Sequence, residues 1–153
     1  MYSEAGLMRR AVLEAKKAFL LDEVPVGAVI FDNVNRKILS SGHNLVEKHQ
    51  NKLLHAEIVA INKLFAASNS KYIGNCSIFV TLEPCLACIG AILNSGIKRI
   101  YYALDDYKCG AFNGRCSALS AHSLGVEVYQ GMMESESREL MERFFRQLRI
   151  NKK

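Results

Sequence analysis

The pattern of hydrophobic positions along this chain changes repeatedly between a helical and an extended period. Apolar side chains recur every three or four residues in 3–21, 54–67 and about 134–150, which is the spacing of one helix face. Elsewhere they form short runs that are typical of buried strands. We predict strands at 26–31, 37–41, 76–81, 99–103 and 126–129.

Turn signals separate these segments. Asp32-Asn33-Val34-Asn35 joins the first two predicted strands in a hairpin. After the second of these strands, a polar loop is expected to extend to about Lys52. Pro84 suits the first position of another helix, because its missing N–H is harmless there, and Gly96 ends that helix. The stretch 104–125 is predicted to be mostly loop, with a short helix near 117–123.

Strands that alternate with helices predict an α/β domain. We expect a three-layer α/β/α arrangement around a five-stranded mixed sheet. The length of 153 residues suits one domain, and no linker or internal repeat interrupts it, so we expect residues 1–153 to form a single domain.

Composition and cysteine content indicate the cellular compartment in which the protein is expected. The charged first 21 residues do not resemble a signal peptide, and no run approaches the roughly 20 apolar residues needed to span a bilayer. We therefore expect a cytoplasmic protein with no membrane partner. In a reducing compartment a C-x-x-C is more typical of metal or redox chemistry than of a structural disulfide.

The net charge of +5 is concentrated at one end of the chain. The chain has five more basic than acidic residues, and five basic residues lie between 143 and 153, where no acid occurs: Arg143, Arg146, Arg149, Lys152 and Lys153. Such a basic C-terminal helix suits a polyanion such as nucleic acid. The alternative is a solvated helix end, where cations are favoured by the helix dipole.

One constellation of residues carries chemistry. His55, Cys85 and Cys88 offer three soft ligands, which on Zn²⁺ leave a fourth tetrahedral position for water, as in catalytic zinc sites. Zinc can lower the pKa of that water from 15.7 to about 7. Glu57 would then move protons from the water to a substrate nitrogen and to departing ammonia. Hydrolytic deamination is the expected reaction, although the same ligands would also serve amide hydrolysis.

The spacing of these residues also predicts their geometry. Cys85 and Cys88 share one helix face at i and i+3, near a helix N-terminus that favours thiolates. Residues two apart inside a helix point about 200° from each other. His55 and Glu57 can therefore converge on one metal only if His55 lies at the helix end. The pattern predicts two helix N-termini that face each other across the zinc.

The cysteines also allow other interpretations. A lone C-x-x-C could be redox-active or simply buried, and a zinc ribbon would need a second pair, which Cys76, Cys109 and Cys116 do not provide. These three are expected to be small core residues or free thiols. The histidines without such context are expected to be loop or packing residues: His43, His49 and His122.

The pair His55-Ala56-Glu57 and Pro84-Cys85-x-x-Cys88 resembles the signature of the zinc-dependent cytidine-deaminase superfamily. Within it, further segments resemble the bacterial tRNA-specific adenosine deaminases over essentially the whole chain. These segments are Val24–Val29, Gly42–Asn44, Thr81–Cys85, Lys108–Ala111 and Arg143–Arg146. The resemblance implies the cytidine-deaminase-like fold, a homodimer, and conversion of the wobble adenosine of a tRNA anticodon to inosine.

The resemblance also implies roles for single residues. His55, Cys85 and Cys88 would bind one zinc ion per subunit, and Glu57 would be the catalytic proton shuttle. Three residues would bind the substrate base: Asn44 by hydrogen bonding, Val26 as an apolar wall, and Ala56. Five would contact the tRNA anticodon arm: Lys108, Phe144, Phe145, Arg146 and Arg149. The anticodon loop is single-stranded, so its target base can be splayed out at little cost.

The chain departs from that family in two loops. Asn51–Leu54 replaces the usual Asp-Pro-x-Ala, and Cys109, followed by 112–114, stands where a small residue or threonine is commoner. We expect these loops to border the pocket and to affect RNA contacts.

Three functions follow from these observations. The first is deamination of the wobble adenosine, with tRNA-Arg bearing an ACG anticodon as the expected substrate. The second is deamination of free bases or nucleosides such as guanine or cytosine, which shares the metal site but has no need for the basic tail. The third is a non-catalytic zinc module that binds RNA, against which Glu57 argues, because a structural site has no use for that carboxylate.

Overall fold

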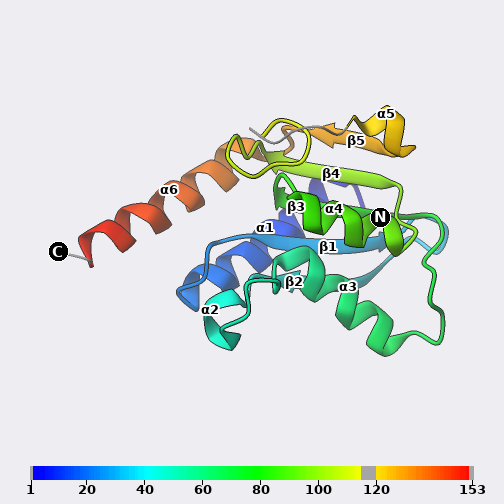
Figure 1. Cartoon of the computed structure of the whole chain (residues 1–153), viewed down its shortest axis with the longest axis horizontal. Coiled ribbons are helices and arrows are strands. Elements are labelled where there is room, and N and C mark those ends of the chain that lie inside the picture. The colour runs from blue at the N-terminus through cyan, green and yellow to red at the C-terminus, as the bar shows by residue number, and fades with distance from the viewer. Residues whose placement is uncertain (1, 115–119, 152–153) are drawn as a thin grey trace.

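The computed structural model describes residues 2–114 and 120–151, in which a five-stranded sheet carries helices on both faces (Figure 1). The strands are β1 (Gly27–Asp32), β2 (Lys37–His43), β3 (Cys76–Leu82), β4 (Arg99–Leu104) and β5 (Glu127–Gln130). Their order in the sheet is β2-β1-β3-β4-β5. β1 is antiparallel to both of its neighbours, whereas β3, β4 and β5 are parallel. The predicted mixed sheet is thus confirmed.

The helices are α1 (Glu4–Leu20), α2 (Val46–His49), α3 (Ala56–Ala67), α4 (Leu86–Asn94), α5 (Ala121–Leu124) and α6 (Glu134–Ile150). α3 packs on β1 and β2, and α4 lies beside it over the same face. α1 covers the opposite face, with the start of α6 next to it. The remainder of α6 projects away from the sheet, as the red end of the ribbon in Figure 1 shows.

Each face of the sheet has its own apolar core. Beneath α3 and α4 the buried side chains include Ala60, Ile78, Ile89, Ile92 and Ile100. Beneath α1 they include Met8, Ala11, Phe31, Phe79 and Tyr101. The central strands are therefore buried on both sides, which explains why they are continuous apolar runs without polar alternation.

Three predicted element boundaries were wrong. The polar loop before Lys52 contains the one-turn helix α2. α4 begins at Leu86 with Cys85 as its N-cap, so Pro84 lies before the helix and not at its first position. The short helix expected near 117–123 is α5, which begins at Ala121. Residues 117–119 of that prediction, together with Cys116, Lys152 and Lys153, lie outside the described residues.

The apolar side of α6 is only partly covered. Phe144 is buried, and its ring meets that of Phe19 on α1 at a centroid distance of 6.0 Å. Phe145 and Leu148, by contrast, are 41% and 40% exposed. The helical period of α6 was predicted correctly, but the helix runs past the edge of the fold, so its last turns have nothing to pack against.

Among the described residues, no helix combines the length and the apolar character that a membrane crossing requires.

Gly27 allows α1 to lie close to the sheet. A Cβ atom at this position would lie 2.0 Å from the carbonyl oxygen of Ala11 and 2.4 Å from the amide nitrogen of Ala15, both on the α1 backbone. We predict that Gly27→Ala lowers the free energy of unfolding by about 1–3 kcal/mol, because backbone atoms cannot yield as a flexible side chain could. Urea denaturation measures this.

Gly90 in α4 provides the matched control, since a Cβ there has no neighbour within 4 Å. Gly90→Ala should leave the stability unchanged or raise it by up to about 1 kcal/mol, because alanine favours a helix interior. Equal losses of stability in the two variants would contradict the close-approach argument.

Candidate active site

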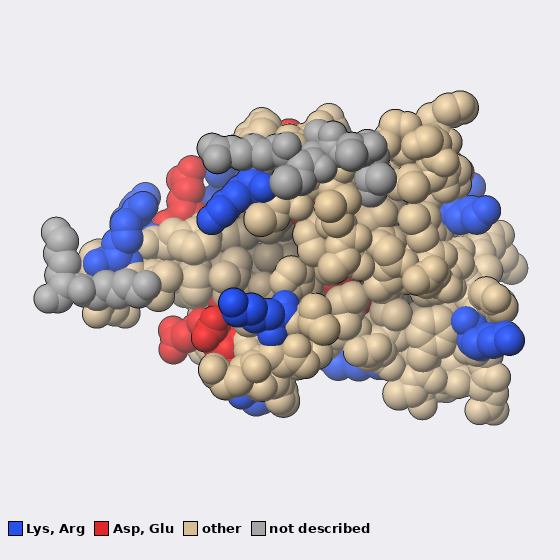
Figure 2. All heavy atoms as spheres, in the orientation of Figure 1, with Lys and Arg blue, Asp and Glu red and all other residues tan. Residues whose placement is uncertain are grey.

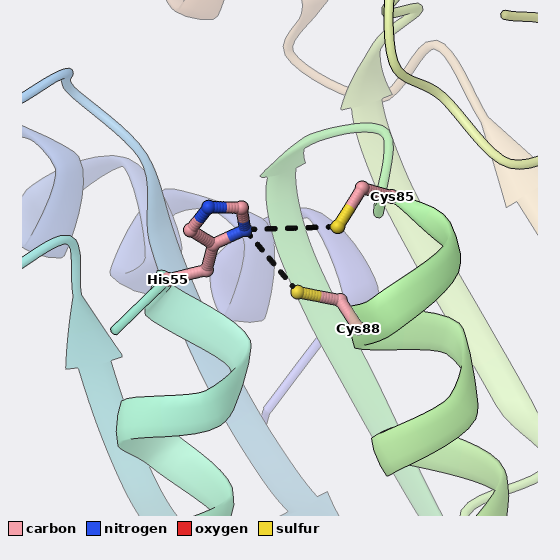
Figure 3. Close-up of side chains that lie close together, drawn as sticks. All are labelled: His55, Cys85 and Cys88. Atoms are coloured by element: carbon pink, nitrogen blue, oxygen red, sulfur yellow. Dashed lines mark hydrogen bonds between the residues drawn. The ribbon is translucent and has the colours of Figure 1, made fainter. Parts of the chain in front are cut away.

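Two helix N-termini bring three metal-ligating side chains together. His55 is the N-cap of α3 and has an extended backbone, with φ −68° and ψ 158°. Cys85 is the N-cap of α4, and Cys88 lies in the first turn of that helix. Figure 3 shows the imidazole directed toward both sulfur atoms across the gap between the helices. The predicted arrangement of two facing helix N-termini is confirmed.

The distances within this cluster suit a tetrahedral metal. His55 Nδ1 lies 3.4 Å from Cys88 Sγ and 3.7 Å from Cys85 Sγ, and all three ligand atoms lie within 4.8 Å of one another. Zinc bonds of about 2.1 Å to nitrogen and 2.3 Å to sulfur give tetrahedral edges of roughly 3.6 Å. The cluster therefore fits zinc at three corners, and the fourth corner remains for another ligand.

The protonation of the cluster is asymmetric. A hydrogen bond with Cys88, and then one with His55, lower the pKa of the Cys85 thiol to about 3. The bond with Cys85, and then burial, raise the pKa of Cys88. The bond to Cys85 also raises the pKa of His55, although burial opposes it. Because a metal binds the thiolate form of cysteine, the raised pKa of Cys88 means that metal binding displaces a proton from this residue.

Glu57 lies in the first turn of α3 and is 3% exposed. Burial raises the pKa of its carboxyl group to about 7. Because His55 caps the helix instead of lying inside it, both side chains reach the same cavity. This places a carboxyl group with a near-neutral pKa beside the metal ligands, and such a group can both accept and donate protons at physiological pH.

A cavity of about 270 Å³ opens next to the ligands and includes Glu57 in its wall. One side is formed by Val26 and Asn44 together with residues of α2, and the other by Asp106 and Cys109. Figure 2 shows a hollow on this face of the molecule, with Lys and Arg side chains on either side of it. A cavity of this size accommodates a single planar base rather than a large ligand.

Asn44 is held in one orientation within this wall. Its Oδ1 atom accepts a hydrogen bond of 3.0 Å from the backbone N–H of Ala56. The Nδ2 group, for which no described residue provides an acceptor, is thereby left as a donor toward the cavity. The side chain of Ala56 itself is buried, so this residue acts on the pocket through its backbone.

The two unusual loops differ in their relation to the cavity. Cys109 lines it, as expected, whereas Asn51–Leu54 and 112–114 are not among the described residues that form its wall. Lys108 is exposed beside Cys109 but does not line the cavity either. None of the four described cysteines forms a disulfide. His43 packs against Glu14 at a distance of 2.8 Å, away from the site.

The side chains expected to contact RNA from α6 fall into two groups. Phe145, Arg146 and Arg149 share an exposed face of the projecting helix. Phe144 is 8% exposed and packs between Phe19 and Phe145, so its expected role in RNA contact is corrected to that of a packing residue. The physical reason is that α1 covers the face of α6 to which Phe144 belongs, together with the buried Leu140.

Sequence reasoning missed two buried acids in the wall of the cavity, Glu23 and Glu83, which are 1% and 2% exposed. Glu23 accepts hydrogen bonds from the backbone N–H groups of Glu47 and Lys48, at distances of 3.1 and 2.8 Å. Glu23 lies between α1 and β1, before a Val-Pro step, and Glu83 directly follows β3, before a Pro-Cys step. No pattern in the sequence distinguishes such acids from ordinary surface charge.

Comparison with known proteins agrees with this geometry. Residues 1–104 match the family described as the cytidine and deoxycytidylate deaminase zinc-binding region. The tRNA-specific adenosine deaminase of Rickettsia felis is 44% identical over 93% of this chain and 100% of its own length. The enzyme of the same name from Bacillus subtilis is 34% identical over 95% and 91%.

Solved structures show the same architecture. One, from a study of A-to-I editing by tRNA:A34 deaminases at the wobble position of transfer RNA, has a TM-score of 0.78 and 33% identity, covering 88% of this chain and 97% of that chain. A guanine deaminase from Nitrosomonas europaea has a TM-score of 0.82 over 94% of this chain and 85% of that chain, but at 17% identity this concerns the fold alone. On the family match and the similarity to full-length relatives, this chain belongs to the zinc-dependent cytidine and deoxycytidylate deaminase family, in its group of tRNA-specific adenosine deaminases.

Proposed function

We propose that this protein deaminates adenosine at the wobble position of a tRNA anticodon, giving inosine and ammonia with consumption of one water molecule. The observation that carries this proposal is a base-sized cavity in which Glu57 lies beside His55, Cys85 and Cys88. Its relatives of known activity, similar over nearly the whole chain, are tRNA-specific adenosine deaminases. The expected substrate is tRNA-Arg with an ACG anticodon.

His55, Cys85 and Cys88 would hold one zinc ion per subunit. When bound here, zinc supplies a Lewis acid that makes a water molecule nucleophilic near neutral pH. The dipoles of α3 and α4 direct their positive ends at this point, which stabilises the anionic cysteine ligands. The two facing helices also fix the ligand positions before the substrate arrives.

Glu57 is proposed as the proton shuttle. It would take the two protons of the attacking water one after the other, delivering the first to the ring nitrogen of the base and the second to the amino group, which leaves as ammonia. A carboxyl group with a pKa of about 7 suits this sequence, because neither direction of transfer is then strongly uphill. Burial excludes bulk water that would otherwise exchange these protons.

Asn44 and Val26 are proposed to hold the base. The Asn44 Nδ2 group is oriented by the bond between its Oδ1 atom and Ala56, and can donate to an acceptor on the base edge. Val26 offers an apolar wall on the same side of the cavity. A flipped base would thus be fixed by one polar contact and by packing, which is how enzymes of this kind read an extruded nucleotide.

The exposed face of α6 is proposed to contact the anticodon arm through Phe145, Arg146 and Arg149, with Lys108 contributing near the cavity. Arginine pairs with phosphate, and an exposed aromatic ring can stack on an unpaired base. The homodimer and the cytoplasmic location remain predictions. Light scattering of the purified protein would measure the mass of the assembly.

An editing assay tests the proposed activity. Zinc-loaded protein incubated with tRNA-Arg bearing an ACG anticodon should convert the wobble adenosine to inosine, which sequencing detects as A-to-G. Glu57→Ala should still bind zinc and tRNA but lose turnover by at least about a thousandfold, because no other group replaces the shuttle. A zinc-loaded wild-type protein that leaves the base unedited, yet releases ammonia from guanine or cytosine, would replace this proposal with free-base deamination.

Metal binding tests the ligand set. Cys88→Ser should lose stoichiometric zinc, whereas Cys109→Ser should retain it, because the exposed Cys109 thiol lies outside the cluster. For the wild type, the raised pKa of Cys88 means that zinc binding releases a proton. The apparent zinc affinity should therefore increase about tenfold or more per pH unit between pH 6 and 8. Competition with a chromogenic chelator measures this, and a pH-independent affinity would contradict it.

The salt dependence of tRNA binding tests the proposed role of α6. In the double variant Arg146→Gln/Arg149→Gln, tRNA binding should weaken, and the slope of log affinity against log salt should become shallower by about one to two. The matched control removes two exposed lysines from the segments that precede β3 and β4, Lys71→Gln/Lys98→Gln, with the same change in net charge. Equal slopes in the two double variants would show that α6 makes no specific phosphate contact.

A further inference from the structure

The loop that follows β4 forms one side of the cavity. We call residues 105–114 the rim loop. Asp106 and Cys109 line the cavity from this loop. Asp106 Oδ1 accepts hydrogen bonds of 3.0 Å from the backbone N–H groups of Lys108 and Cys109, which makes a tight turn. The position of this turn therefore decides the shape of the cavity on that side.

Glu83 holds the rim loop from beneath. Its Oε2 atom accepts a hydrogen bond of 2.9 Å from the backbone N–H of Asp106. Its Oε1 atom accepts bonds of 2.8 Å from the N–H groups of Phe112 and Asn113. Both carboxylate oxygens are thus used, at the two ends of the loop, and hydrogen bonds to an ionised acceptor are about twice as strong as neutral ones.

Gly110 brings the loop against this carboxylate. A Cβ atom there would lie 2.3 Å from both Cδ and Oε2 of Glu83, and 2.6 Å from the carbonyl oxygen of Asp106. The neighbouring Ala111 N–H donates to the carbonyl of Pro84 at 3.0 Å, and Gly110 forms a β-bridge with Cys85. The rim loop therefore wraps around the side chain of Glu83 and meets the start of α4.

We propose that Glu83 is a positioning residue, which latches the rim loop in place and so sets the affinity for the nucleotide in the cavity. This inference rests on the proposed function. All three backbone N–H partners of Glu83 lie in the rim loop, so its role here is to hold that loop. It acts through Asp106 and Cys109.

The latch adjoins the chemical machinery at Cys85, through the β-bridge of Gly110, but the other ligands and the proton shuttle are held by different elements. His55 and Glu57 are positioned by α3, which packs on β1 and β2 on the far side of the cavity. Cys88 is buried within α4. Loosening the rim loop should therefore change how tightly the nucleotide binds while the ligands and the proton shuttle stay in place.

Glu83→Gln tests the latch with little change in volume. The amide replaces one acceptor oxygen by an NH₂ group, which would face a backbone N–H donor and repel it. For an anticodon stem-loop RNA we expect the half-saturating concentration in single-turnover editing to rise roughly tenfold, from the loss of at least one charged hydrogen bond. The rate at saturating RNA should stay within about threefold of the wild type, and zinc content should be unchanged. Hydrogen–deuterium exchange of the rim-loop amides should accelerate.

Two further variants separate a latch from general stabilisation. Glu14→Gln alters another buried carboxylate, which binds Lys17, Ser41 and His43 on the α1 side of the sheet. It should lower the melting temperature but leave the half-saturating RNA concentration unchanged. Gly110→Ala disturbs the latch from the loop side and should raise that concentration as Glu83→Gln does.

Each outcome bears on the latch directly. An unchanged half-saturating concentration in Glu83→Gln, an equal increase in Glu14→Gln, or loss of zinc would overturn it. If Glu83→Gln does not fold, Gly110→Ala decides by the same measurements. If the wild type edits no RNA, the proposed function fails, and rim-loop exchange still tests the latch: unaltered exchange in Glu83→Gln would refute it.

Discussion

The site depends on one constraint, which is that α3 and α4 both begin at the same end of the strands. β1 is antiparallel to both β2 and β3, so β2 and β3 run in the same direction, and α3, which comes after β2, begins at the same end of the strands as α4, which comes after β3. The first turns of both helices have N–H groups without helical partners, and their dipoles present positive charge. This positive charge favours metal-ligating thiolates at the site, because the backbone itself supplies part of the compensating charge.

At the same end of the strands, three buried acids line one cavity: Glu23, Glu57 and Glu83. Two of them are satisfied by backbone N–H groups, Glu23 at α2 and Glu83 at the rim loop. Glu57 differs, because burial raises its pKa to about 7 instead of being offset by such a set of donors. Glu23 and Glu83 thereby anchor neighbouring backbone segments, whereas Glu57 faces the metal ligands as the proposed proton shuttle.

A different part of the molecule faces the larger substrate. α6 is anchored to α1 through Phe144, and beyond that residue it leaves the fold with exposed Phe145, Arg146 and Arg149. An exposed helix end with apolar and basic side chains gains little stability from packing, so its composition is not explained by the fold alone. The separation is consistent with a division of labour, in which the cavity recognises a base and the projecting helix recognises its polymeric context.

The sequence by itself determined most of the elements, the mixed sheet, and the placement of His55, Cys85 and Cys88 near helix N-termini, because periodicity and ligand spacing are local properties. It missed α2 and placed Pro84 inside α4. It also predicted that Cys109 would border the cavity. It could not predict that Phe144 is covered while Phe145 is not, because that depends on where α1 ends relative to α6. Nor could it assign Glu23 and Glu83, whose partners lie 23 or more residues away in the chain. Burial and hydrogen-bond partners are settled only when distant segments meet, and for these residues the tertiary structure alone decided the role.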